Sequence, residues 1–176
     1  MTELDDLRYP IGKHNVRAPI DAASVQNAIR DIREMPDRLA AAVAGLSDKQ
    51  LDTSYRPGGW TVRQVVHHLP DSHMNAFTRL KLALTEDVPV IKPYDEEKWA
   101  ELADARLPVE SSLSLVRGLH ARWASLLEGL SPADFERELM HPETGKFSIA
   151  QLTGLYGWHS RHHVAHITTL RTRSGW

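Results

Sequence analysis

Apolar residues recur every three or four positions in four long segments of this chain, and this pattern limits the fold more than any other feature. The segments span residues 22–45, 61–84, 112–130 and 148–173. This spacing places the apolar side chains along one face of an α-helix. No convincing pair of strands appears. The sequence therefore predicts an all-α fold in which four amphipathic helices pack as a four-helix bundle.

Two of these segments begin with a capping box. Thr61 is followed three residues later by Gln64, and Ser148 is followed in the same way by Gln151. In this arrangement the hydroxyl and the amide each satisfy a backbone N–H that the first helical turn leaves free. Helices are therefore expected to begin at these two positions.

Shorter elements are expected around the four helices. Residues 1–20 carry Pro10, Gly12 and Pro19 and predict an extended N-terminal arm. Pro36 should kink or divide the first long helix. Short helices are expected over residues 96–103 and 133–139. The whole chain, 1–176, is interpreted as one domain, because its length suits a single core.

Composition excludes several classes of protein. The net charge is −2 and no dense basic stripe appears, which argues against a nucleic-acid partner. No apolar run is long enough to cross a bilayer, and the acidic start of the chain is unlike a secretory signal. There is no cysteine, which excludes disulfides and thiolate ligands. We expect a cytoplasmic protein that acts on a small molecule.

Histidines are the unusual feature of the last segment. Four of the ten, His159, His162, His163 and His166, fall within eight residues. On a helical wheel His159, His162 and His166 share the apolar face, while His163 lies toward its edge. Residues four apart face the same way, which suits two ligands of one metal ion. The spacing favours His162 and His166 as ligands, with His159 as a neighbouring group.

A third ligand is expected from the second long segment, and His68 and His73 are the candidates. The wheel slightly prefers His73. However, Pro70 should distort the helix at this point, so spacing leaves both residues open. His120 on the third segment is expected to pack in the core, and His14, His67 and His141 are expected to face solvent. Zinc and nickel both accept imidazole ligands.

No other catalytic motif competes with this metal site. The residue after His162 is His163, so no His-Glu-x-x-His protease motif is present. No nucleophile elbow accompanies a serine, which argues against a Ser-His-Asp triad.

Several segments carry a likeness to a known family. Residues 58–69 (GGWTVRQVVHHL), 71–75 (DSHMN) and 158–167 (WHSRHHVAHI), with Tyr9-Pro10-Ile11-Gly12 in the arm, resemble the YfiT family of the DinB-like superfamily. Ile167-Thr168-Thr169 departs from the His-Arg-Gly-Gln often seen after the last histidine in the wider superfamily.

The resemblance implies a DinB-like four-helix bundle that forms a homodimer and holds one divalent metal ion per subunit. Carried over by motif, the ligands are His68, His162 and His166, which resolves the choice between His68 and His73 by analogy. The resemblance implies a metal-dependent hydrolase that activates water. It also includes thiol transferases of the bacillithiol type, so S-transfer is an alternative. A metal-stabilised binding module without catalysis is the second alternative.

Overall fold

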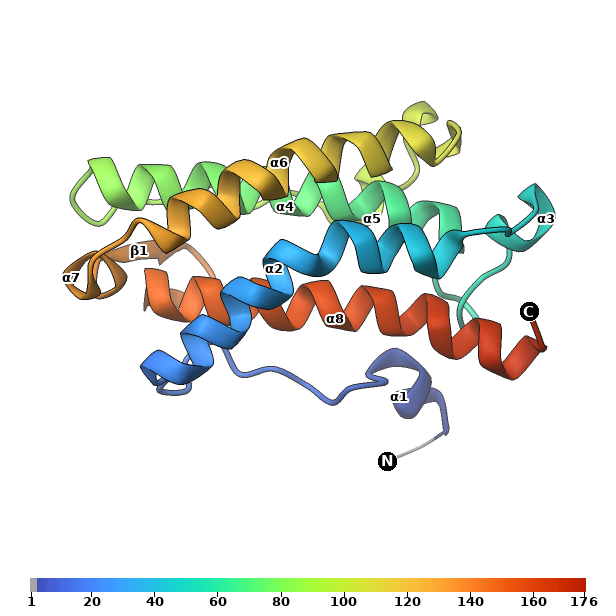
Figure 1. The fold of residues 1–176 in the computed structure, drawn as a ribbon, viewed down its shortest axis with the longest axis horizontal. Coiled ribbons are helices and arrows are strands. Elements are labelled where there is room, and N and C mark those ends of the chain that lie inside the picture. The colour runs from blue at the N-terminus through green and yellow to red at the C-terminus, as the bar shows by residue number, and fades with distance from the viewer. Residues whose placement is uncertain (1–2) are drawn as a thin grey trace.

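The computed structural model describes residues 3–176 and confirms the all-α four-helix bundle (Figure 1). Its four long helices are α2 (Ala22–Val43), α4 (Val62–Thr85), α6 (Glu110–Glu128) and α8 (Ile149–Ser174). Among the described residues, none of the helices has the length and apolar character needed to cross a membrane.

Both predicted capping boxes are present. The Thr61 hydroxyl accepts from the backbone N–H of Gln64 at 3.1 Å, and the Gln64 amide oxygen accepts from the N–H of Thr61 at 2.9 Å. Ser148 and Gln151 repeat this exchange at the start of α8, at 3.2 and 2.9 Å. These local bonds fix where α4 and α8 begin.

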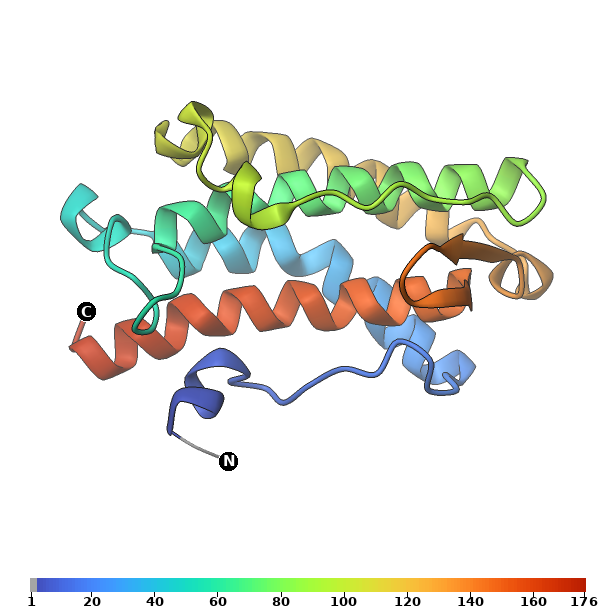
Figure 2. The same cartoon turned by 180° about the vertical axis from the view of Figure 1, so that it is seen from behind.

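Consecutive long helices are not always neighbours in this bundle. α2 and α4 both pack against α6 and α8, so α2 lies diagonally across from α4. α4 and α6 point the same way, because residues 86–109 run back along the bundle between them (Figure 2). That segment contains α5 (Glu96–Trp99) and the 3-10 helix η1 (Ala103–Arg106).

The shorter elements differ in part from the sequence prediction. The arm is not extended throughout, because α1 (Glu3–Arg8) opens it, and α3 (Asp48–Leu51) was not predicted. The helix expected over residues 133–139 is limited to α7 (Pro132–Phe135). An antiparallel hairpin follows, made of β1 (Glu138–His141) and β2 (Gly145–Ser148).

The hairpin corrects the expectation that the chain has no strand pair. Leu139 pairs with Phe147, and both side chains are buried. Gly145, at φ 81°, supplies the left-handed backbone that closes the turn. The two strands are too short for their alternation to stand out in the sequence.

Pro36 does not divide α2, which continues as one helix and bends near its middle (Figure 1). Because proline has no N–H, the carbonyl of Ile32, four residues earlier, lacks its helical partner. The imidazole Nδ1 of His120 donates to that carbonyl instead, at 2.5 Å. α4 likewise continues through Pro70.

Two apolar clusters fill the interior. One cluster contains Ile32, Ala76, Trp123 and Tyr156, and the other contains Met35, Leu69, Val116 and Ile167. Five histidines of α4, α6 and α8 contact one another through their ring nitrogens, and we call them the polar layer: His68, His73, His120, His159 and His163.

Candidate metal centre

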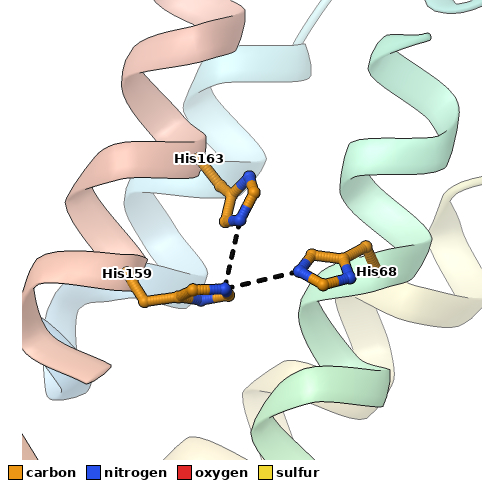
Figure 3. Close-up of side chains that lie close together, drawn as sticks. All are labelled: His68, His159 and His163. Atoms are coloured by element: carbon orange, nitrogen blue, oxygen red, sulfur yellow. Dashed lines mark hydrogen bonds between the residues drawn. The ribbon is translucent and has the colours of Figure 1, made fainter. Parts of the chain in front are cut away.

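Three side chains of the polar layer meet between α4 and α8 (Figure 3). His68 projects from α4, and His159 and His163 project from successive turns of α8. Nε2 of His159 lies 3.4 Å from Nε2 of His68 and 3.1 Å from Nε2 of His163. Nitrogens bound tetrahedrally at ~2.1 Å from a zinc ion are about 3.4 Å apart. These two distances are close to the spacing of ligands of one ion, and ligand atoms of all three residues lie within 4.8 Å of one another.

Burial keeps these imidazoles neutral, as metal binding requires. Burial, helped by the nearby His166, lowers the pKa of His68 to about 4. Burial also lowers the pKa of His159 and of His163 well below 6.5, and neighbouring imidazoles add to this effect. A neutral ring keeps a lone pair on one nitrogen. The rings can therefore bind a cation at neutral pH without first losing a proton.

Behind His159, hydrogen bonds lead through two more buried histidines to the backbone of α2. Nδ1 of His159 lies 3.0 Å from Nε2 of His73. Nδ1 of His73 lies 2.8 Å from Nε2 of His120, whose Nδ1 contacts the Ile32 carbonyl. His73 and His120 thus lie behind His159, outside the group of converging nitrogens.

Of the three ligands predicted from sequence, His68 lies in the converging group and His162 and His166 lie beside it. His162 and His166 contact each other with ring centroids 4.3 Å apart. Nε2 of His166 donates to the carbonyl of Arg8 at 3.0 Å, and the His162 ring stacks on Trp158 at 4.3 Å. Their Nδ1 atoms are buried, and no hydrogen bond to either is found among residues 3–176.

The helical wheel assigned His163 to the edge of α8 because it assumed one apolar stripe. In the structure α2, α4 and the N-terminal arm all cover α8, so buried residues surround most of its circumference. His163 is buried on the side that faces α4. The contact of α4 with α8, which spacing alone does not reveal, brings His163 and His159 toward His68.

A cavity of about 290 Å³ opens onto the three rings, a size that suits a small molecule. The Trp60 ring packs on His68 at 4.7 Å between centroids. His162, His166 and Trp158 of α8 also line the cavity. Further aromatic and charged side chains of the wall come from the arm, the 55–60 loop and α5: Arg8, Tyr9, Tyr55, Arg56, Glu96 and Glu97.

Glu96 places a carboxylate on this wall, and the sequence analysis did not identify it. Glu96 is exposed, but partial desolvation raises its pKa, and the nearby Glu97 and Asp95 raise it further. A carboxyl with a raised pKa is a better proton acceptor than an ordinary one. Glu96 is far from the histidines in sequence, and only the return of residues 86–109 along the bundle brings it to the pocket.

His67 corrects another expectation, because it is buried and does not face solvent. Its Nδ1 lies 2.7 Å from the Ser112 hydroxyl, and its Nε2 lies 2.9 Å from the carbonyl of Leu107. These bonds join α4 to the start of α6. His14 and His141 are partly buried. None of the three lines the pocket.

The chain is similar to known proteins over nearly its whole length. The family model described as the DinB superfamily matches residues 31–167. Proteins named "Putative metal-dependent hydrolase" from Bacillus cereus (strain 03BB102) and Bacillus anthracis (strain A0248) are each 54% identical over 173 residues. The match covers 98% of this chain and 100% of each relative.

A solved structure is similar over nearly the whole fold. YfiT from Bacillus subtilis, described as a probable metal-dependent hydrolase with an unusual four-helix bundle topology, superposes with a TM-score of 0.93. It shares 48% sequence identity, and the match covers 97% of this chain and 99% of that one.

Proposed function

The chain belongs to the DinB superfamily, and on that basis we propose that it is a metal-dependent hydrolase with a small-molecule substrate. The observation that carries this proposal is the convergence of three Nε2 atoms, from His68, His159 and His163, beside a cavity. The names of the similar Bacillus proteins support metal dependence.

We take His68, His159 and His163 as the ligands in preference to the set His68, His162 and His166. Nε2 of His159 is close to the Nε2 atoms of both other rings in the first set. In the second set, Nε2–H of His166 donates to the Arg8 carbonyl, which leaves Nδ1 as the one nitrogen of that ring that can bind a metal. Imidazole ligands suit zinc and nickel, and we propose one such ion per subunit.

Three protein ligands leave coordination positions for water or substrate, as catalytic sites do. When bound, the ion supplies Lewis acidity that lowers the pKa of water toward ~7. Glu96 and Glu97 both line the pocket wall, and we propose that Glu96, whose pKa is raised, accepts the proton of an attacking water. Arg8 and Arg56 place positive charge on the same wall, where it can bind an acidic or developing negative oxygen of the substrate.

The assay compares metal-loaded and metal-free protein on a panel of activated esters and amides, without thiol. We expect turnover that needs the metal and is lost in His163→Ala. A second arm supplies an electrophile with bacillithiol, mycothiol or glutathione, because this chain has no cysteine to provide a thiol. Conjugation that needs thiol, with no hydrolysis above the His163→Ala level, would establish S-transfer instead. Absence of both reactions in metal-loaded protein would favour a non-catalytic binding module.

We further propose that the protein is a cytoplasmic homodimer without nucleic-acid or membrane partners. The resemblance to the YfiT family implies the homodimer, the net charge of −2 argues against a nucleic-acid partner, and the lack of cysteine suits the cytoplasm. Light scattering should give twice the chain mass of 19.8 kDa. A mass of 19.8 kDa at micromolar concentration would argue against the dimer.

A further inference from the structure

Four groups form what we call the hydrogen-bonded line: His159, His73, His120 and the Ile32 carbonyl. The last of them can only accept a hydrogen bond. The carbonyl of Ile32 carries no hydrogen, so Nδ1 of His120 must be the donor of their 2.5 Å bond. This carbonyl is free because Pro36 cannot supply the helical N–H that would otherwise bind it. The position of one proline in α2 therefore determines which nitrogen of His120 is protonated.

The same reasoning assigns the protonated nitrogen of each further ring in the line. His120 is neutral, because burial lowers its pKa to about 4, and its single proton is on Nδ1. Its Nε2 can then only accept, so Nδ1 of His73 donates across the 2.8 Å contact. The Nε2 of His73 is left as an acceptor, so Nδ1 of His159 donates to it across 3.0 Å.

The last ring in the line belongs to the metal site. With its proton on Nδ1, His159 has its lone pair on Nε2, the atom that lies nearest His68 and His163. We propose that the Ile32 carbonyl, freed by Pro36, acts through His120 and His73 to fix His159 in the tautomer and orientation that bind the metal. His73 and His120 are positioning residues, and this inference rests on the proposed metal site.

A fixed tautomer should have a measurable effect on metal affinity. An imidazole that donates its second N–H to a partner is held in one orientation and is a more basic ligand. Removing such a partner typically lowers metal affinity 10- to 100-fold. Of the three proposed ligands, His73 is hydrogen-bonded to His159, and its other ring nitrogen bonds to His120. Substitution of His73 therefore tests the line directly.

The first test is made on the metal-free wild-type protein and needs no substitution. Two-bond ¹H–¹⁵N spectra of ¹⁵N-labelled protein at neutral pH report which nitrogen of each histidine is protonated. We expect the Nδ1–H tautomer for His120, His73 and His159. The Nε2–H tautomer at any of the three would overturn the inference.

The second test measures zinc affinity by competition with a chelator. His73→Leu removes both the acceptor and the donor, and we expect its affinity to fall about 10- to 100-fold. In His73→Gln, the amide oxygen can accept from His159 and the NH₂ can donate to His120. We expect this variant to recover most of the loss.

His67→Leu is the matched control, since His67 is also a buried, doubly hydrogen-bonded histidine of α4 but lies outside the line. Its zinc affinity should stay near the wild-type value even if its stability falls. Equal losses in His67→Leu and His73→Leu, or none in His73→Leu, would overturn the inference.

The two proposals fail in different ways. If wild-type protein binds zinc tightly and His163→Ala does not, the metal site is supported. The zinc affinities of the His73 variants then test only the hydrogen-bonded line. If the wild type binds no metal, the proposed function fails, and the tautomers measured in metal-free protein still decide whether the line exists. The same spectra decide the matter should His73→Leu not fold.

Discussion

The histidines of this molecule differ in role because their ring nitrogens face different partners. Nε2 of His68, His159 and His163 converge, whereas both nitrogens of His73 bond to other imidazoles. Residue type and spacing predicted a three-histidine site between the second and fourth long helices, and the converging group lies between these two helices, α4 and α8. They could not distinguish His159 and His163 from His162 and His166, because the two pairs have the same spacing and lie on adjacent faces of α8.

Glu96 provides a prediction for the proposed proton transfer. In Glu96→Gln the amide keeps the shape of the side chain but cannot accept a proton, so hydrolysis should fall about 100- to 10,000-fold. Zinc affinity should be unchanged, because Glu96 is not in the converging group. The steady-state rate on the best ester or amide substrate measures this effect.

Glu101→Gln is the control for charge, because Glu101 is exposed just beyond α5 and does not line the metal pocket. Its rate should match the wild type. A Glu96→Gln enzyme with a wild-type rate would remove Glu96 from the mechanism.

The buried histidines also predict how stability depends on pH. Their folded pKa values lie below 6.5, and that of His68 is about 4, so the unfolded chain binds more protons than the folded one between these values. Each unit of pKa difference corresponds to about 1.4 kcal/mol. The free energy of unfolding of metal-free protein should be greatest above about pH 6.5 and should fall as the pH drops toward ~4.

Urea denaturation at several pH values measures this dependence. The variant His68→Leu, which lacks one of the titrating groups, should show a shallower fall. A free energy of unfolding that is constant across this range would contradict the burial of neutral imidazoles.

At the scale of elements, the close approach of α2 and α8 holds the site in place. Gly157 of α8 sits against Ala28 of α2, where a Cβ on Gly157 would lie 2.6 Å from the Ala28 Cβ and 2.7 Å from its Cα. Gly157 and Ala28 therefore let the helix that carries His159 and His163 pack tightly against the helix that carries Ile32 and Pro36.

Gly157→Ala should destabilise the protein by about 1–3 kcal/mol, because the added methyl forces the two helices apart. Gly118→Ala on α6 is the matched control, since nothing lies within 4 Å of the added Cβ. This change should stabilise the helix by about 0.5–1 kcal/mol. Thermal unfolding of both variants measures the two changes in stability. Equal changes in the two variants would show that the contact between α2 and α8 at Gly157 is unimportant.

The long helices could be predicted from sequence because their causes are local. Capping boxes at Thr61 and Ser148 and the helical spacing of apolar residues lie within each segment. The continuity of α2 through Pro36 could not be predicted, because the bond that compensates for the missing N–H comes from His120 on another helix. The hairpin was missed because pairing between two four-residue strands leaves a weak local signal.

For the whole molecule, the proposed metal site would cross-link two sides of the bundle. His68 lies on α4 and the other two proposed ligands lie on α8, so an ion bound there would join helices that are 91 residues apart in sequence at the His68–His159 pair. An ion that binds only the folded state should stabilise the whole bundle.

Zinc at 100 times its dissociation constant should therefore raise the free energy of unfolding by about 2.7 kcal/mol. Thermal or urea unfolding with zinc and with chelator gives the difference, and His163→Ala should show none. An equal rise in that variant would place the bound zinc elsewhere on the protein.

The most direct test of the central claim is a cobalt or zinc titration of four single variants that share the same helix. If His159 and His163 are ligands with His68, His159→Ala and His163→Ala should lose stoichiometric binding. His162→Ala and His166→Ala should keep it within about tenfold, as expected for groups beside the ligands. Loss of binding in His162→Ala and His166→Ala, with retention in His159→Ala and His163→Ala, would contradict this site and assign the metal to His68, His162 and His166.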